Sequence, residues 1–338
     1  MAAYFLTNTT AGIVAVLFPG WRDIARVVLQ VVLYLLMVRA LARAWVASAA
    51  RHVGGLGFSL AIALIVGLPA EATGFLFVAI GSDAPAMAFA GLFICSVFHA
   101  IRGGGAGAWS AATALALVCA LLRPSGVLAP LLLIVVVLCL IVNRRLGGRC
   151  AVMLAAALLI VLPGLAALVA RPTAIYLFRH DPLIFAAAID PVPSWVPWQF
   201  HNGVVVKGLR ETWMEPPSTL PEYVVLAVTR LVYFLAPFRP GFSPLHIAVN
   251  TCYVVLLVAA VVSGWRVLRR RGEVLVALAL AGHVWLHAVF YSALVVDDFR
   301  YPLPIWPALW LLGGIGLVES ARSRRAAAGD IAPNAGAP

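Results

Sequence analysis

The chain has 338 residues, of which 63% are hydrophobic and only 11% are charged, and its mean hydropathy is +1.02. This composition excludes a soluble globular protein and indicates a polytopic membrane protein. The apolar stretches lack the period-two alternation of barrel strands, so an all-α transmembrane bundle is predicted. Basic residues outnumber acidic ones by 24 to 13, but the arginines lie in short links between apolar segments, which indicates membrane topology and excludes nucleic acid as a partner.

Apolar stretches long enough to cross a hydrocarbon layer about 30 Å thick recur along the chain. We expect about nine spans, near 24–43, 55–80, 84–101, 106–122, 126–143, 150–170, 245–265, 273–296 and 302–319. The stretch 223–238 is also apolar, but Arg230 lies in its middle, so an interfacial helix is expected there. The expected regions are an N-terminal bundle (1–170), an irregular extracytoplasmic loop (171–244), C-terminal transmembrane helices (245–319) and a disordered cytoplasmic tail (320–338).

Arginine distribution predicts the orientation, because cytoplasmic links of membrane proteins are enriched in basic residues. With the N-terminus outside, the cytoplasmic side receives fourteen arginines: Arg39, Arg43, Arg51, Arg102, Arg144, Arg145, Arg149, Arg266, Arg269, Arg270, Arg271, Arg322, Arg324 and Arg325. The short outer segments receive four: Arg22, Arg26, Arg123 and Arg300. We therefore expect a multi-pass protein of the inner (plasma) membrane with its C-terminus in the cytoplasm.

A cluster of charge separates the last two expected spans, at Asp297, Asp298, Arg300 and Tyr301. One interpretation is a solvated turn with an internal Asp–Arg pair and an interfacial tyrosine. The other is a binding site, in which the carboxylates bind substrate hydroxyls or a divalent metal and Arg300 holds an anionic group through its planar donors. Both interpretations place the cluster at the outer surface, and the need for a metal cofactor is left undetermined.

Two further links are expected at the same surface. In Arg123-Pro124-Ser125-Gly126, proline ends one helix and Ser125 is suited to cap the next, which leaves Arg123 as either a phosphate ligand or a snorkelling side chain. Asp83 opens another span, two residues before Pro85, and is suited both to an N-cap and to catalysis.

Two motifs inside the spans allow either a functional or a structural role. His283 and His287 lie four residues apart on one helical face, a spacing that can ligate a metal, but no third ligand is near in sequence except the distant pair Asp297 and Asp298. The glycines at 313, 314 and 316 predict a close approach of two helices.

The order of these signals resembles the multi-spanning glycosyltransferases of the GT-C class, a group that includes protein mannosyltransferase-like and aminoarabinose transferase-like enzymes. The matching stretches are IARVVLQVVLYLLMVRALAR (24–43), GLPAEATGFLFVAIGSDAPAM (67–87), ALALVCALLRPSGVLAPLLL (114–133) and DFRYPLPIWPALWLLGGIGL (298–317). The LRPSG and RYPLPxxP pieces are the most distinctive.

The resemblance implies transfer of a sugar from a polyprenyl-phosphate carrier, at the outer face of the membrane, to a lipid, glycan or protein hydroxyl. It assigns Arg123, Arg300 and Tyr301 to the carrier phosphate, and Asp83, Asp297 or Asp298 to orienting or deprotonating the acceptor. Such enzymes usually begin with a further span and an acidic first outer loop, and here only Asp23 precedes the first expected span. Either the start codon is misassigned, the chain is a degenerate homologue, or the base comes from elsewhere. The alternative function is a non-catalytic homologue, or a transporter or flippase subunit for lipid-linked glycans.

Overall fold

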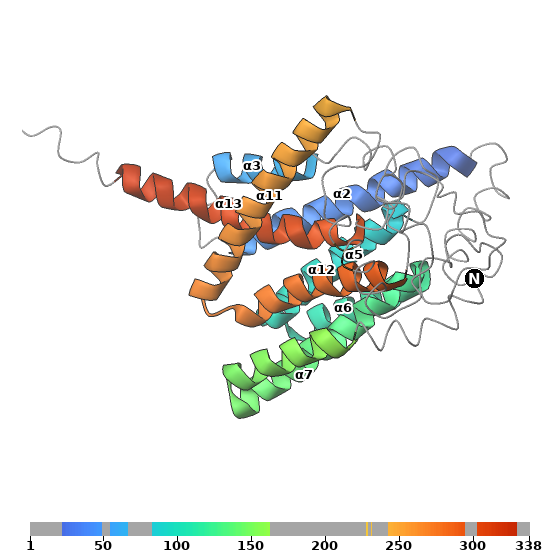
Figure 1. Ribbon diagram of the computed structural model, residues 1–338, viewed down its shortest axis with the longest axis vertical. Coiled ribbons are helices and arrows are strands. Elements are labelled where there is room, and N and C mark those ends of the chain that lie inside the picture. The colour runs from blue at the N-terminus through green and yellow to red at the C-terminus, as the bar shows by residue number, and fades with distance from the viewer. Residues whose placement is uncertain are drawn as a thin grey trace, which may run out of the picture.

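A computed structural model describes residues 22–48, 55–66, 83–162, 228, 231, 243–294 and 303–329. The regular structure of these residues is entirely helical (Figure 1). The α-helices are α2 (Arg22–Ser48), α3 (Gly55–Val66), α5 (Asp83–Ile101), α6 (Gly105–Leu122), α7 (Leu128–Leu146), the helix Gly148–Leu162, α11 (Pro244–Arg270), α12 (Val274–Leu294) and α13 (Trp306–Gly329). Two short 3₁₀ turns, η1 (Pro124–Val127) and η3 (Leu303–Ile305), precede α7 and α13.

Seven helical segments in the described part of the chain are long and apolar enough to cross a membrane. They are Val27–Ser48, Ala84–Ile101, Gly105–Leu122, Ser125–Leu146, Pro244–Arg270, Val274–Tyr291 and Leu303–Ser323. They confirm seven of the nine expected spans and an all-α, multi-pass membrane protein. The other two expected spans are described only over α3 and Gly148–Leu162, and the expected loop only at residues 228, 231, 243 and 244.

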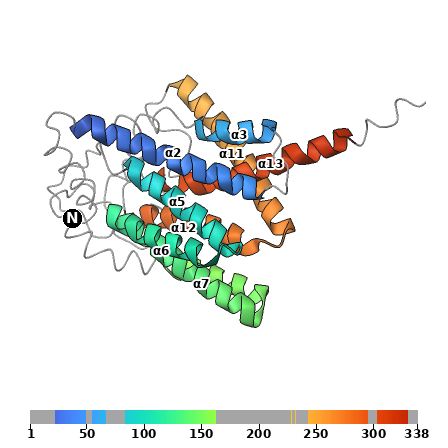
Figure 2. The same ribbon diagram turned by 180° about the vertical axis from the view of Figure 1, so that it is seen from behind.

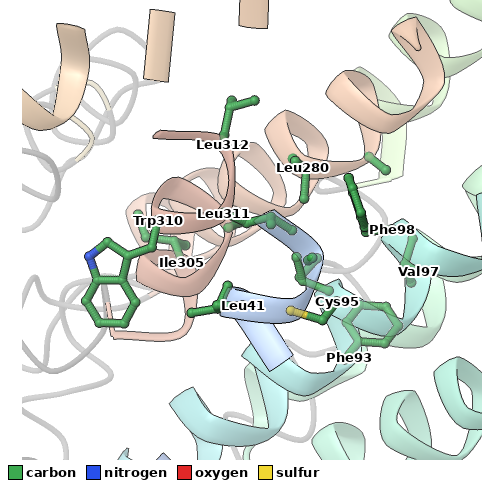
Figure 3. Packing of buried hydrophobic residues seen from close by; sticks show 14 of the residues in the cluster. Leu41, Phe93, Cys95, Val97, Phe98, Leu280, Ile305, Trp310, Leu311 and Leu312 are labelled. Atoms are coloured by element: carbon green, nitrogen blue, oxygen red, sulfur yellow. The ribbon is translucent and has the colours of Figure 1, made fainter. Parts of the chain in front are cut away.

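The core of the bundle lies between α13 and α5, which pack against α2, α3, α11 and α12. Trp310 and Leu311 of α13 and Phe93 of α5 are completely buried. Figure 3 shows side chains from α2, α5 and α13 meeting around Leu41, and Figure 2 shows α5 lying between α2 and α6. Because lipid tails are as apolar as these side chains, close van der Waals packing rather than exclusion from water holds such helices together.

Glycines allow α11 and α13 to cross at very short range. A Cβ added to Gly264 would lie 1.9 Å from the carbonyl oxygen of Leu312, and one added to Gly316 would lie 2.4 Å from that of Ala260. Gly314 makes room for the indole of Trp45, whose Nε1–H donates to the Leu311 carbonyl oxygen at 3.2 Å. The close packing expected from this glycine-rich stretch is therefore confirmed.

Arginines gather at one end of the bundle, the arginine-rich end, which contains the C-terminal ends of α2, α5, α7, α11 and α13 (left in Figure 1). Two ion pairs join helices there. Arg102 lies 3.2 Å from Glu273, and Arg271 lies 2.8 Å from Glu319 while also donating to the Ser48 carbonyl oxygen at 2.6 Å. Successive helices run in opposite directions, so the first residue of α5, the last of α6 and the last of α12 share the opposite end.

The last helix is longer than expected. The sequence predicted a span that ends near residue 319 and a disordered tail over 320–338, whereas α13 continues to Gly329. Glu319 ties this extension to the bundle through Arg271 and also binds Arg322 one turn later, at 3.4 Å. The following alanines have the highest helix propensity of any residue. Residues 330–338 of the expected tail lie outside the described residues.

The crossing at Gly264 gives a prediction about stability. Gly264→Ala should lower the free energy of unfolding by about 1–3 kcal/mol, because the new methyl group meets a backbone oxygen that cannot move aside. Gly107→Ala on α6 is the matched control, since an added Cβ there meets nothing within 4 Å and alanine favours the helix. Thermal unfolding in detergent measures both variants, and equal midpoints would contradict the proposed close contact.

Candidate functional site

A row of polar side chains follows one face of α12 into the bundle. His283, His287 and Tyr291 are spaced four residues apart, so they stack above one another on a single helical face. All three are buried. The imidazole centroids of His283 and His287 are 4.4 Å apart, and the Tyr291 ring follows 6.4 Å from His287. We call these three residues the α12 polar row.

The hydrogen bonds of the two histidines fix their tautomers. His283 Nε2 lies 2.9 Å from the carbonyl oxygen of Pro304, and His287 Nδ1 lies 3.0 Å from the carbonyl oxygen of His283. A carbonyl oxygen only accepts, so each of these nitrogens carries the proton and donates it. The second nitrogen of each ring is left as an acceptor when the imidazole is neutral. His283 Nδ1 is buried and makes no hydrogen bond within the described residues.

The Pro304 carbonyl is available to His283 because the chain is not α-helical there. Residues Leu303–Ile305 form the 3₁₀ turn η3, and all three are buried. Proline has no N–H, so Pro307 cannot donate a 3₁₀ hydrogen bond back to the Pro304 carbonyl. His283 supplies a donor from the neighbouring helix, and this hydrogen bond places the η3 turn beside the middle of α12.

Tyr291 ties the polar row to the link between α6 and α7. Its hydroxyl donates to the buried hydroxyl of Ser125 at 2.5 Å. The sequence predicted Ser125 as a helix cap, which is wrong: the residue before α7 is Val127, and no side chain caps that helix. Gly126 lets the link pack tightly, because a Cβ there would lie 1.7 Å from the carbonyl oxygen of Cys119.

This link positions Arg123, the predicted phosphate ligand. Arg123 ends α6 in an extended conformation and is half-buried. It lies two residues before Ser125, the hydrogen-bond partner of Tyr291 in the α12 polar row. The structure therefore brings Arg123 together with the α12 polar row at the opposite end of the bundle, a combination that the sequence did not predict.

The other predicted site residues are placed only in part. Asp83 is the first residue of α5, and its backbone lies at the same end of the bundle as Arg123, although its side chain is not among those described. Asp297, Asp298, Arg300 and Tyr301 lie outside the described residues. The segment that contains them joins the last residue of α12 to η3.

The sequence did not indicate Tyr291 as a site residue, and it predicted a different role for Ser125. The available signal was the repeat of polar residues at every fourth position in an otherwise apolar span, which continues from the two histidines to Tyr291. The partner on η1 could not be identified in this way, because the contact joins residues 166 positions apart. Among the described residues, no group of three His, Cys, Asp or Glu side chains is arranged to hold a metal ion.

A pocket also lies at the arginine-rich end. A pocket of about 1010 Å³ is lined by Arg102, Asn143, Arg149 and Glu273, among others. The Arg102–Gly105 stretch forms a tight turn, with positive φ at Gly103 and Gly105. Arg102 is committed to Glu273 and to the Ala47 carbonyl oxygen, so this end is organised by structural ion pairs.

Comparisons of the chain with known protein families, with curated proteins and with solved structures gave no match. Function must therefore be argued from the composition, the topology and the site. Together, the apolar helices establish an integral membrane protein with seven candidate spans in its described residues. The distinctive feature of its opposite end is a half-buried arginine on the link that is hydrogen-bonded to the buried polar row.

The Tyr291–Ser125 hydrogen bond can be tested by a double-mutant cycle. Tyr291→Phe leaves the buried Ser125 hydroxyl without its donor, and we expect a loss of about 1–3 kcal/mol in the free energy of unfolding. Adding Ser125→Ala should restore part of that loss, because both polar partners are then removed. Strictly additive losses in thermal unfolding would show that the two hydroxyls do not interact.

Proposed function

We propose that the protein is a membrane glycosyltransferase that takes a sugar from a polyprenyl-phosphate carrier and transfers it to a lipid, glycan or protein hydroxyl. The observation that carries the proposal is the anchoring of Arg123. A guanidinium at a membrane surface usually snorkels on a mobile stem, but this one is half-buried at the end of α6, on a link fastened by Ser125 and Gly126. A fixed, planar set of donors suits the phosphate of a lipid carrier.

The reaction follows from this charge arrangement. The acceptor oxygen attacks the anomeric carbon, the bond between that carbon and the phosphate oxygen breaks, and the polyprenyl phosphate leaves with an added negative charge. Arg123, with Arg300 and Tyr301, stabilises this charge. A carboxylate from Asp83, Asp297 or Asp298 accepts the acceptor's proton or orients its hydroxyl.

Orientation is part of the proposal. The arginine-rich end faces the cytoplasm and the Arg123 end faces outward, as expected for a protein of the inner (plasma) membrane whose basic links are retained inside. The lipid-linked donor is then met in the outer leaflet. The segregation of described arginines such as Arg144 and Arg270 at one end of the bundle supports this orientation.

A specific observation favours transport of a lipid-linked glycan as the second candidate. Transporters carry polar groups and interrupted helices near the bilayer midplane. His283 lies near the middle of α12 and binds the carbonyl oxygen of Pro304, in the 3₁₀ turn that precedes α13. These groups lie deeper than surface chemistry requires, so the α12 polar row would then contact the substrate during its passage.

Transfer from purified polyprenyl-phosphate sugars separates the two candidates. Wild-type protein supplied with a panel of donors should release polyprenyl phosphate, and Arg123→Gln should lower the rate about 100-fold, because a group that stabilises the leaving charge is lost. Asp298→Asn should lower it by a similar factor. Arg144→Gln, at the arginine-rich end, is the matched control and should retain the wild-type rate.

Two results of the transfer assay would contradict the proposed transferase. Wild-type turnover in Arg123→Gln would remove this residue from the site. Absence of chemistry with every donor, combined with movement of a fluorescent lipid-linked glycan across vesicles, would favour the transporter.

Labelling with a membrane-impermeant maleimide tests the orientation. In a chain whose five native cysteines have been replaced, Val127→Cys should react in intact cells, because Val127 is exposed near the opposite end. Gly107→Cys, at the start of α6, should react only after permeabilisation. Reversed accessibility of the two positions would overturn the proposed orientation.

A further inference from the structure

A lateral groove of about 650 Å³ lies between α11, α12 and α13. Its walls are apolar over most of their length and include Val262 and Trp265 of α11, Trp285 of α12 and Leu309 of α13. Val262 is 40% exposed and Trp285 is 42% exposed, so the groove opens to the surroundings of the bundle. These helices are spans, so the surroundings are lipid hydrocarbon over most of their length.

The groove has a charged edge at the arginine-rich end. Arg266 and Arg269 line it, and their spacing of three residues places them on the same face of α11. Both are exposed, and neither has an ion-pair partner among the described residues. This separates them from Arg271, whose guanidinium is bound to Glu319.

We propose that this groove binds an anionic phospholipid from the leaflet at the arginine-rich end. The lipid phosphate binds Arg266 and Arg269, and one acyl chain lies along the apolar wall towards Trp285 and Leu309. Residues 261–269 of α11 rise by about 12 Å, which gives the chain a continuous apolar surface below the headgroup. The site is distinct from the carrier site proposed at Arg123, which lies at the other end of the bundle.

Charge complementarity selects this occupant. Two adjacent guanidinium groups with no acidic partner in the described part of the chain carry a local charge of two, which a net-negative headgroup can neutralise. A zwitterionic lipid brings its own ammonium group close to the two arginines, so its electrostatic attraction to them is weaker. A second copy of the chain would have to insert an acidic side chain into the groove, and its binding is a separate outcome of the test.

Native mass spectrometry of the full-length protein tests the proposal. The protein is purified in detergent and mixed with equal amounts of phosphatidylglycerol and phosphatidylcholine that have identical acyl chains. We expect retained phosphatidylglycerol to exceed retained phosphatidylcholine about tenfold in the wild type, because the two arginines near the membrane surface attract the net-negative headgroup. In R266Q/R269Q this ratio should fall towards one.

Two matched variants make the result specific. R144Q/R145Q removes the same charge from the same end of the bundle at α7 and should keep the wild-type preference. Ala281→Phe fills the groove from α12 and should reduce retention of both lipids. Arg123→Gln should also keep the preference, which separates failure of this site from failure of the proposed transferase.

Three results would overturn the proposal. One is an unchanged preference in R266Q/R269Q. Another is an equal loss in R144Q/R145Q, which would indicate general attraction to a basic surface. The third is a dimer that depends on Arg266 and Arg269 and excludes lipid, which would assign the groove to a second copy.

Discussion

Inside a bilayer, no water is available to form hydrogen bonds with backbone groups that are not paired within a helix. The hydrogen bond between His283 and the Pro304 carbonyl oxygen satisfies one such group. The proline-rich approach to α13 creates such a group within the bundle. A donor from α12 satisfies it, so α13 can begin among the other helices. The short contacts at Gly264 and Gly316 then become possible.

The charged side chains at the two ends of the bundle have different surroundings. At the arginine-rich end, the pairs Arg102–Glu273 and Arg271–Glu319 link helices that are distant in sequence, and other arginines remain exposed. Partly exposed ion pairs of this kind fix register more than they stabilise. At the opposite end, the half-buried Arg123 lies two residues before Ser125, whose hydroxyl accepts the Tyr291 hydrogen bond.

The α12 polar row connects the broken backbone to this arginine. His283 binds Pro304, His287 binds the carbonyl of His283, and Tyr291 binds Ser125 on the link that carries Arg123. A change in the position of η3 would therefore reach Arg123 through packed and hydrogen-bonded groups only. The proposed transferase depends on Arg123 and the transporter alternative on the α12 polar row, and the Tyr291–Ser125 hydrogen bond joins these two sets of residues.

The sequence alone determined the membrane class, the all-α fold and seven spans. The reason is that the length of an apolar segment is a local property, and a segment about as long as the bilayer is thick can span it as a helix. It also predicted the close packing around Gly316 and the segregation of the arginines. Only the tertiary structure revealed that Ser125 binds Tyr291 rather than capping α7, and that His283 binds the carbonyl oxygen of Pro304. Those roles depend on contacts between helices far apart in the chain, and no local pattern specifies which faces meet.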